Sequence, residues 1–79
     1  MIKVLFFGPV ADTIGQRSID IEYRIDMSLQ DLRESLAQRF PQAFGIVAFT
    51  AVNGVQTRNM RQLLADRSEI AFMAKFSGG

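Results

Sequence analysis

The stretch Glu69-Ile70-Ala71-Phe72-Met73-Ala74-Lys75-Phe76 decides the fold, and Ser77-Gly78-Gly79 follows it directly. A short apolar run of this kind is typical of a buried β-strand. The two glycines that come next have no side chains, so their backbone is narrow enough to thread a tunnel in another protein. The pattern predicts a rigid strand that carries a slender tail, with a frayed terminus as the alternative.

A second apolar run lies at the other end of the chain, over residues 2–7. Alternate residues of a strand point to opposite faces, which groups Ile2 with Val4 and Phe6, and Lys3 with Leu5 and Phe7. Strands that are largely apolar on both faces lie in the middle of a sheet. We therefore expect the first and last strands to be adjacent, parallel and central.

Two hairpins are predicted at the edges of this sheet. Residues 17–23 alternate between polar and apolar side chains, which is typical of an edge strand antiparallel to the first one. Asn53-Gly54 separates the apolar residues 46–52 from residues 55–57, and this dipeptide is a strong hairpin signal. The last strand then begins after a turn at residues 66–68.

One helix is clearly predicted between these hairpins. Ser28 is a good N-cap, Asp31 lies near the positive end of the helix, and Pro41 ends it. Its apolar stripe consists of Leu29, Leu32, Leu36 and Phe40. A shorter helical segment is expected at residues 10–14, a connector at residues 43–45, and one helical turn at residues 58–64.

These elements define an α+β domain, in which a mixed sheet of about five strands has one main helix across one face. The layout with parallel, central terminal strands is the β-grasp, or ubiquitin-like, arrangement. We expect residues 1–76 to form this single domain and residues 77–79 to form a flexible tail.

The composition excludes several kinds of chemistry. Cysteine and histidine are both absent, which removes disulfides, thiol nucleophiles, the commonest general base and the commonest metal ligands. A formal net charge of +1 provides no electrostatic footprint for nucleic acid or for an anionic membrane. No stretch reaches the roughly 20 apolar residues that span a bilayer, and no signal peptide is recognisable, so a cytoplasmic protein is expected.

Two surface regions are candidate partner contacts. The helix can cover only one of the two alternating sets, so either Leu5, Phe7, Ala71 and Met73 or the opposite set forms an apolar patch on the open face. The alternation does not settle which set is covered. Phe76, at the end of the last strand, is counted with this interface. Arg58 and Arg61 could flank an acidic partner or an anionic substrate, although solvated charges are the simpler interpretation.

The remaining reactive group is the carboxylate of Gly79, which Ser77 and Gly78 would carry into a partner. A partner enzyme could activate this carboxylate with ATP as an acyl-adenylate, and a sulfur donor such as a persulfide could then displace AMP. The product is a thiocarboxylate on Gly79. This role requires no catalytic side chain, bound metal or cofactor in the chain itself.

The chain resembles the family of small, sulfur-carrying subunits of molybdopterin synthase over essentially its whole length. The matching segments are Lys3-Val4-Leu5-Phe6-Phe7, Ile14-Gly15, Ser28-Leu29-Gln30-Asp31-Leu32, Ala51-Val52-Asn53-Gly54, Glu69-Ile70-Ala71-Phe72 and Gly78-Gly79. The chain departs from the family pattern at Ala74-Lys75, where a proline pair is frequent, and at Asp66-Arg67-Ser68-Glu69, where Asp-Gly-Asp-Glu is usual.

The resemblance implies a mechanism and its partners. Gly79 would carry the thiocarboxylate into the large catalytic subunit of molybdopterin synthase, where the sulfur passes to cyclic pyranopterin monophosphate. A ubiquitin-activating-like adenylyltransferase would recharge the chain. Phe7 and Met73 fall where the family places apolar interface contacts.

Three other functions stay open. A sulfur carrier for thiamine thiazole synthesis shares the chemistry, but it is usually shorter and lacks the segment around residues 9–15. A ubiquitin-like modifier would be joined through Gly79 to lysines of target proteins. A plain interaction module would carry the Gly-Gly sequence without using it.

Overall fold

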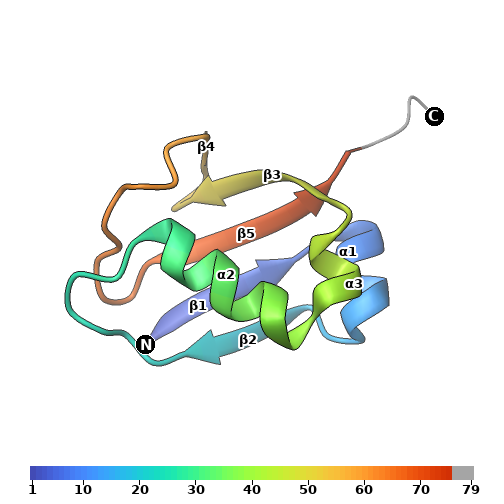
Figure 1. Cartoon of the computed structure of the whole chain (residues 1–79), viewed down its shortest axis with the longest axis horizontal. Coiled ribbons are helices and arrows are strands. Elements are labelled where there is room, and N and C mark those ends of the chain that lie inside the picture. Colours follow the sequence, from blue (N-terminus) through green and yellow to red (C-terminus); the bar gives the residue numbers. More distant parts are fainter. Residues whose placement is uncertain (76–79) are drawn as a thin grey trace.

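The computed structural model describes residues 1–75 and contains one five-stranded mixed sheet with the strand order β2-β1-β5-β3-β4 (Figure 1). The strands are β1 (Ile2–Phe6), β2 (Ser18–Ile21), β3 (Val47–Val52), β4 (Val55–Thr57) and β5 (Glu69–Ala74). The helices are α1 (Gly8–Ile14), α2 (Leu29–Arg39) and α3 (Pro41–Phe44). This architecture confirms the predicted α+β, β-grasp fold.

The two terminal strands lie side by side at the centre of the sheet. β1 and β5 are parallel, with Val4 opposite Ile70 and Phe6 opposite Phe72. The hairpins flank this pair, because β2 is antiparallel to β1 and β3 is antiparallel to β5. Both turn residues of the β3–β4 hairpin have positive φ angles, 50° at Asn53 and 82° at Gly54, which explains the choice of this dipeptide.

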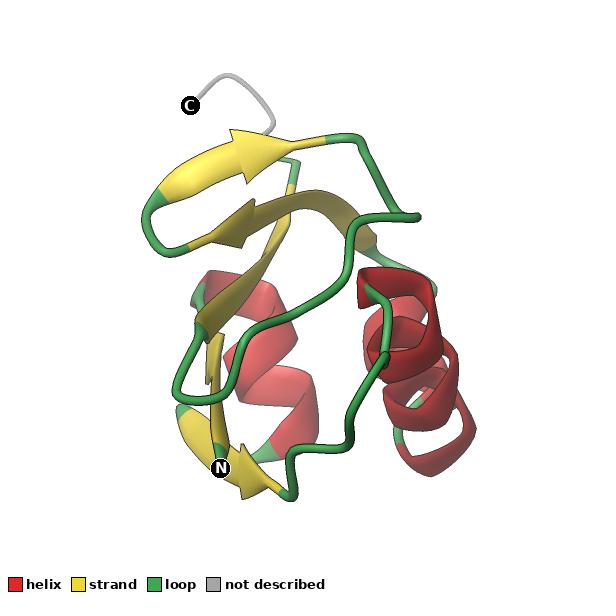
Figure 2. Cartoon of the chain, turned by 90° about the vertical axis from the view of Figure 1, so that its left-hand side faces the viewer, coloured by secondary structure: helices red, strands yellow, loops and turns green. Residues whose placement is uncertain are grey.

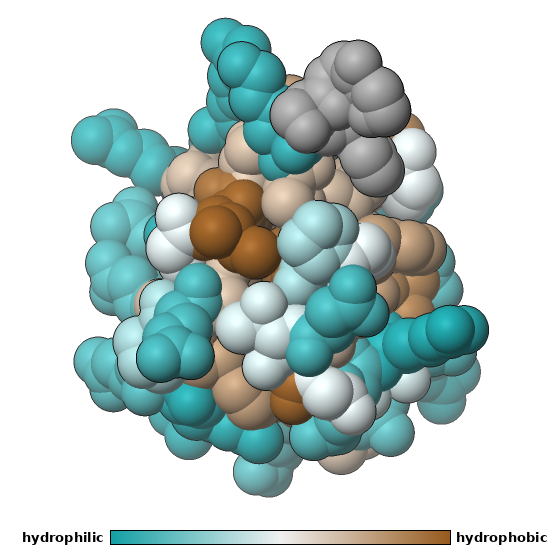
Figure 3. All heavy atoms as spheres, turned by 90° about the vertical axis from the view of Figure 1, so that its right-hand side faces the viewer, coloured by the Kyte–Doolittle hydropathy of each residue, from teal (hydrophilic) through white to brown (hydrophobic). Residues whose placement is uncertain are grey.

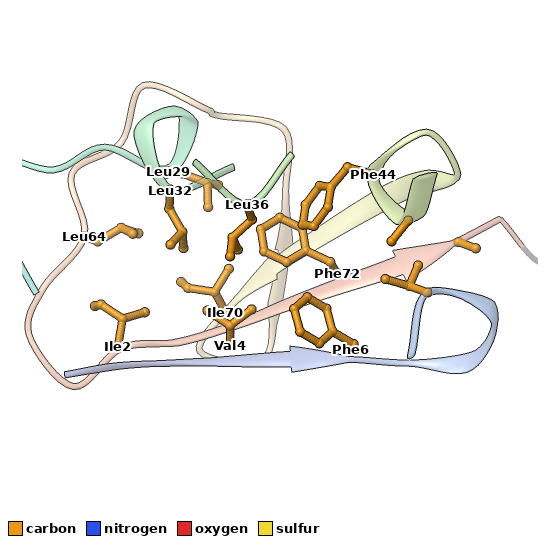
Figure 4. Close-up of a cluster of buried hydrophobic side chains, with 13 residues drawn as sticks. Ile2, Val4, Phe6, Leu29, Leu32, Leu36, Phe44, Leu64, Ile70 and Phe72 are labelled. Atoms are coloured by element: carbon orange, nitrogen blue, oxygen red, sulfur yellow. The ribbon is translucent and has the colours of Figure 1, made fainter. Parts of the chain in front are cut away.

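Helix α2 crosses one face of the sheet, as the edge-on view shows (Figure 2). Its start is a capping box: the Ser28 hydroxyl accepts a hydrogen bond from the Asp31 N–H at 3.0 Å, and the Asp31 carboxylate accepts one from the Ser28 N–H at 3.0 Å. The buried stripe is Leu29, Leu32 and Leu36, as predicted, whereas Phe40, also expected in the stripe, is the C-cap residue and is only partly buried. These leucines pack against the inward residues of β1 and β5 (Figure 4).

Helix α3 corrects the expected connector at residues 43–45. Pro41 ends α2 but also begins this single turn, because its fixed φ angle suits the first position of a helix. The turn buries Phe44, whose ring lies 4.9 Å from that of Phe72 and 6.4 Å from that of Phe6 between centroids. The edge-to-face geometry of these pairs is the favourable one for aromatic rings.

The predicted helical turn at residues 58–64 is wrong. The segment is an irregular connection that forms backbone hydrogen bonds with the start of α2. The Met60 carbonyl accepts one from the Gln30 N–H, and the Gln62 carbonyl accepts one from the Leu29 N–H. The Asn59 side chain accepts a bond from the Arg61 N–H at 3.2 Å. The segment thus supplies acceptors to the first turn of α2, where N–H groups lack helical partners.

Helix α1 comes directly after β1 and ends at Gly15. Gly15 has a φ of 82° and donates its N–H to the Ala11 carbonyl, which is the left-handed stop expected of this residue. The helix contributes Val10 to the core and contacts both α3 and β5. Within residues 1–75, no helix is long and apolar enough to cross a membrane.

Candidate functional site

The end of β5 positions the candidate site. β5 lies between β1 and β3, so it is bonded on both edges, and its last residue, Ala74, is opposite Val47 of β3. Lys75 comes next and is exposed. The predicted sulfur-carrying residue Gly79, the tail residues Ser77 and Gly78 and the predicted contact Phe76 lie outside the described residues, so their roles stay predictions.

The structure settles which face of the sheet is open. Ile2, Val4 and Phe6 are at most 2% exposed beneath the helices, as are Ile70 and Phe72 of β5. Leu5, Ala71 and Met73 are half-buried, and Phe7 is 47% exposed. The set that contains Leu5 and Phe7 therefore forms the open face, as a docking surface for a partner requires.

Phe49 belongs to this surface, although the sequence did not single it out. The register places Phe49 beside Met73 and Ala51 beside Ala71, so their side chains share the open face. We call Leu5, Phe7, Phe49, Ala71 and Met73 the open-face patch. The alternation within residues 47–52 was the available signal, but the pairing with β5 could not be read from it.

The open face is charged at one end and apolar at the other. At the start of β5, Lys3 lies between Asp20 of β2 and Glu69 of β5, so this end of the face is charged. Toward the end of β5, the neighbours are Phe49 and Met73. Figure 3 views the molecule from this second end, where separate apolar areas reach the surface among hydrophilic atoms. The apolar part of the face thus lies next to the end of β5.

The backbone of Phe7 fixes the place of its side chain. Phe7 is extended, with φ −125° and ψ 148°, and its N–H donates to the Phe72 carbonyl at 3.3 Å. Its own carbonyl accepts a hydrogen bond from Val10 at the start of α1. With Leu5 and Arg17, Phe7 lines a shallow hollow on the surface. The backbone of Phe7 is therefore fixed between β1 and α1, next to β5, while its ring is exposed.

Arg58 and Arg61 are not brought to this patch. Arg58 lines a groove with α2 residues on the helix-covered side of the sheet. Arg61 is exposed in the same connection, beside Met60, whose carbonyl oxygen bonds to the start of α2. A partner seated on the open-face patch would have to pass around the sheet edge to reach either side chain, so their contact with that partner stays a prediction.

Two carboxylates among the described residues, those of Asp31 and Asp66, have structural roles. The pKa of Asp31 is lowered because its carboxylate accepts the Ser28 N–H in the capping box. The pKa of Asp66 is lowered because its carboxylate lies 2.7 Å from the Met1 ammonium group. Residues 1–75 contain no cluster of acidic side chains that could hold a metal ion. The patch is suited to docking, and neither of these carboxylates belongs to it.

These observations define a class of protein: a ubiquitin-like domain with an apolar open face beside the end of its central strand. The chain belongs to the ThiS family, whose model matches residues 4–79. The match thus includes most of β1, all of β5 and the Gly-Gly sequence. Its fold is that of the ubiquitin-like sulfur carriers.

Solved structures share this fold at low sequence identity. SAMP1 from Haloferax volcanii has a TM-score of 0.83 and 19% identity, with 99% of this chain and 98% of that chain covered. Urm1 from Trypanosoma brucei has a TM-score of 0.77 and 18% identity, with coverages of 99% and 94%. A chain from the Helicobacter pylori complex of molybdopterin-converting factor subunits 1 and 2 has a TM-score of 0.74 and 24% identity, with coverages of 99% and 97%. No curated protein sequence matches the chain.

Proposed function

We propose that this protein is a sulfur carrier that uses the carboxylate of Gly79 and serves molybdenum cofactor biosynthesis. The observation that carries the proposal is the position of the open-face patch beside the end of the central strand β5. A partner that binds the patch would receive the residues beyond Ala74 at a defined place. Three tail residues after Phe76 reach at most about 10 Å, so docking near the strand end is necessary for delivery.

The charging chemistry takes place on an activating partner. The carboxylate of Gly79 attacks the α-phosphorus of ATP and releases pyrophosphate, which leaves an acyl-adenylate. The terminal sulfur of a persulfide then attacks the acyl carbon and displaces AMP. A thiol cleaves the resulting S–S bond, which leaves a thiocarboxylate on Gly79 and a disulfide on the donor side. A ubiquitin-activating-like adenylyltransferase is the class of enzyme for the first step.

The large catalytic subunit of molybdopterin synthase is the proposed receiver. The Helicobacter pylori neighbour is a complex of subunits 1 and 2 of molybdopterin-converting factor, which supports a partner of this kind. Leu5, Phe7 and Met73 would contact it, together with Phe76. Two charged chains would then each pass one sulfur to cyclic pyranopterin monophosphate, because the dithiolene of molybdopterin contains two sulfur atoms.

The delivery step can be tested without the activating enzyme. The thiocarboxylate form of the chain, released from an intein fusion with ammonium sulfide, is mixed with the large subunit and cyclic pyranopterin monophosphate. We expect molybdopterin to form and the mass of the chain to return to that of the carboxylate. The carboxylate form is the control. If the chain gave up its sulfur to thiazole-forming enzymes and their substrates but not to the large subunit, it would belong to thiamine synthesis instead.

A ubiquitin-like modifier is the second candidate, because the chain is also similar to small archaeal modifier proteins. This function uses the same acyl-adenylate but transfers the acyl group to a lysine amine and forms an isopeptide bond. Incubation with the activating enzyme, ATP and cell extract would then produce conjugates of higher mass that end at Gly79. Their absence, with efficient formation of the thiocarboxylate, favours the carrier.

A further inference from the structure

A groove on the helix-covered side of the sheet lies apart from the open-face patch. Its walls are α2 and the connection after β4, and its floor is β3. The lining residues are Gln30, Arg33, Glu34, Val47, Ala48, Thr50, Thr57, Arg58 and Met60, and we call this set the α2–β3 groove. Thr50 faces the groove while its neighbour Phe49 faces the patch, so β3 separates the two surfaces.

The groove carries positive charge that the rest of the described chain does not neutralise. Arg33 comes from α2 and Arg58 from the opposite wall, and neither guanidinium has a carboxylate within 4.0 Å among residues 1–75. Glu34 is the acidic residue of the lining, and its carboxylate accepts a hydrogen bond from the Gln30 amide at 3.0 Å. Arg33 is also held in place, because its guanidinium lies 5.8 Å from the centre of the Phe44 ring.

The floor of the groove includes a stretch of strand without a neighbour. β4 ends at Thr57, which lies opposite Thr50, so Val47, Ala48 and Phe49 of β3 have no partner on that edge. Ala48 is exposed and lies at a bulge, since Val47 and Phe49 face consecutive residues of β5. The bulge limits regular strand addition to a few backbone bonds, so side-chain contacts must provide most of the recognition.

We propose that the α2–β3 groove binds an extended, acidic segment of a partner protein. Guanidinium groups bind carboxylates through paired hydrogen bonds, and two of them on opposite walls favour a segment that crosses the groove with acidic residues on both sides. Val47 on the floor and Met60 on the wall provide apolar contacts for the side chains between those acids. The groove has a volume of about 630 Å³, which is enough for a few residues. This inference does not depend on sulfur transfer, since the site lies on the other side of the sheet from the patch.

The proposal can be tested with a short peptide that alternates glutamate and valine, with NMR as the readout. We expect amide shifts at Arg33, Ala48, Thr50 and Arg58, with little change at Leu5 and Met73. The Arg33→Gln, Arg58→Gln double variant should bind the peptide about tenfold more weakly, and added salt should weaken the wild-type complex. Arg58→Gln alone should retain an intermediate affinity, and it leaves the contact between Arg33 and Phe44 intact.

The matched control is Arg24→Gln, which removes the same charge from an exposed position outside the groove and should leave the affinity unchanged. Shifts centred elsewhere, equal affinity in the double variant, or no binding of the peptide would overturn the proposal. Free glutamate that produces the same shifts at the same concentration would overturn the claim that an extended segment is recognised. A peptide alternating glutamine and valine should bind more weakly than the glutamate peptide.

Discussion

The two faces of the central strands use the same kind of side chain for different purposes. On the helix side, Val4, Ile70 and Phe72 are completely buried. On the open side, their chain neighbours Leu5 and Met73 remain half-buried, and Phe7 is about half exposed. Hydrophobicity alone therefore does not separate residues that stabilise the fold from residues that are available to a partner. The face on which a residue lies makes that separation.

The largest effect is expected for a substitution on the buried face of the sheet. Phe72→Ala removes a ring that packs against both Phe6 and Phe44 and should lower the free energy of unfolding by about 3–5 kcal/mol. In a domain of this size, such a loss approaches the total stability. Met73→Ala, on the open face of the same strand, should cost about 1 kcal/mol or less. Urea unfolding of the two variants measures the contrast, and equal losses would contradict the division between the faces.

The second prediction concerns substitutions in the open-face patch and their effect on partner affinity. Phe7→Glu or Met73→Glu should lower the affinity for the large subunit by about 10–100-fold, because central apolar contacts dominate interfaces. The free energy of unfolding should change by about 1 kcal/mol or less. Calorimetric titration with the large subunit and urea unfolding provide the two measurements. A large loss of stability with unchanged affinity would assign these residues to the core.

Phe49→Glu sharpens the same comparison, because the strand register alone assigns this residue to the patch. We expect a loss of affinity similar to that of Met73→Glu, its cross-strand neighbour. Lys3→Gln, at the charged end of the open face, is the matched control and should bind almost normally. If Lys3→Gln were as damaging as Phe49→Glu, the interface would extend over the whole face.

The terminal strands, apolar on both faces, predicted the central pair and its two sets of side chains, while residues 17–23 and Asn53-Gly54 predicted the edge hairpins. It could not predict which set α2 covers, because both sets are apolar and the choice depends on how the chain crosses the sheet. Phe49 was missed for a related reason: its place depends on pairing with β5 and on the bulge at Ala48, and neither is local. A carrier function was suggested by the tail, which the described residues do not include.

Two local errors have the same origin in contacts between distant segments. Phe44 was expected in a connector, but packing against Phe72 makes the turn at residues 41–44 a buried part of the core. Residues 58–64 contain leucines and a methionine at plausible helical spacing. Their backbone nevertheless bonds to Leu29 and Gln30, which are far away in the sequence. Local patterns do not record such partners.

A smaller effect is expected at the start of α2, which supports only the buried face. Ser28→Ala removes the hydroxyl that accepts the Asp31 N–H and should lower the free energy of unfolding by about 1 kcal/mol. The melting temperature should fall by roughly 4–8 °C. Affinity for the large subunit should not change, because the capping box is on the helix side. A change in affinity larger than the change in stability would contradict this separation.

The smallest effect is a dependence of stability on pH. The folded-state pKa of Asp31 is lowered from its ordinary value of 3.8, so its contribution to stability is present above that value and is lost as the pH falls through the lowered pKa. Asp31→Asn should be less stable than the wild type near neutral pH, and the difference should shrink on acidification. Urea midpoints across the acidic range measure it. A difference that stays constant in acid would mean that the carboxylate charge is not involved.

The most direct test of the account is to locate the transferred sulfur. The chain is incubated with its activating enzyme, ATP and a persulfide donor, and tandem mass spectrometry is applied to the product. We predict that one oxygen is replaced by sulfur in the fragment that contains Gly79 and that all other fragments keep their masses. A chain without Gly79 should gain no sulfur and should unfold like the wild type. Added sulfur on any other residue, or equal addition of sulfur to the chain without Gly79, would contradict the account.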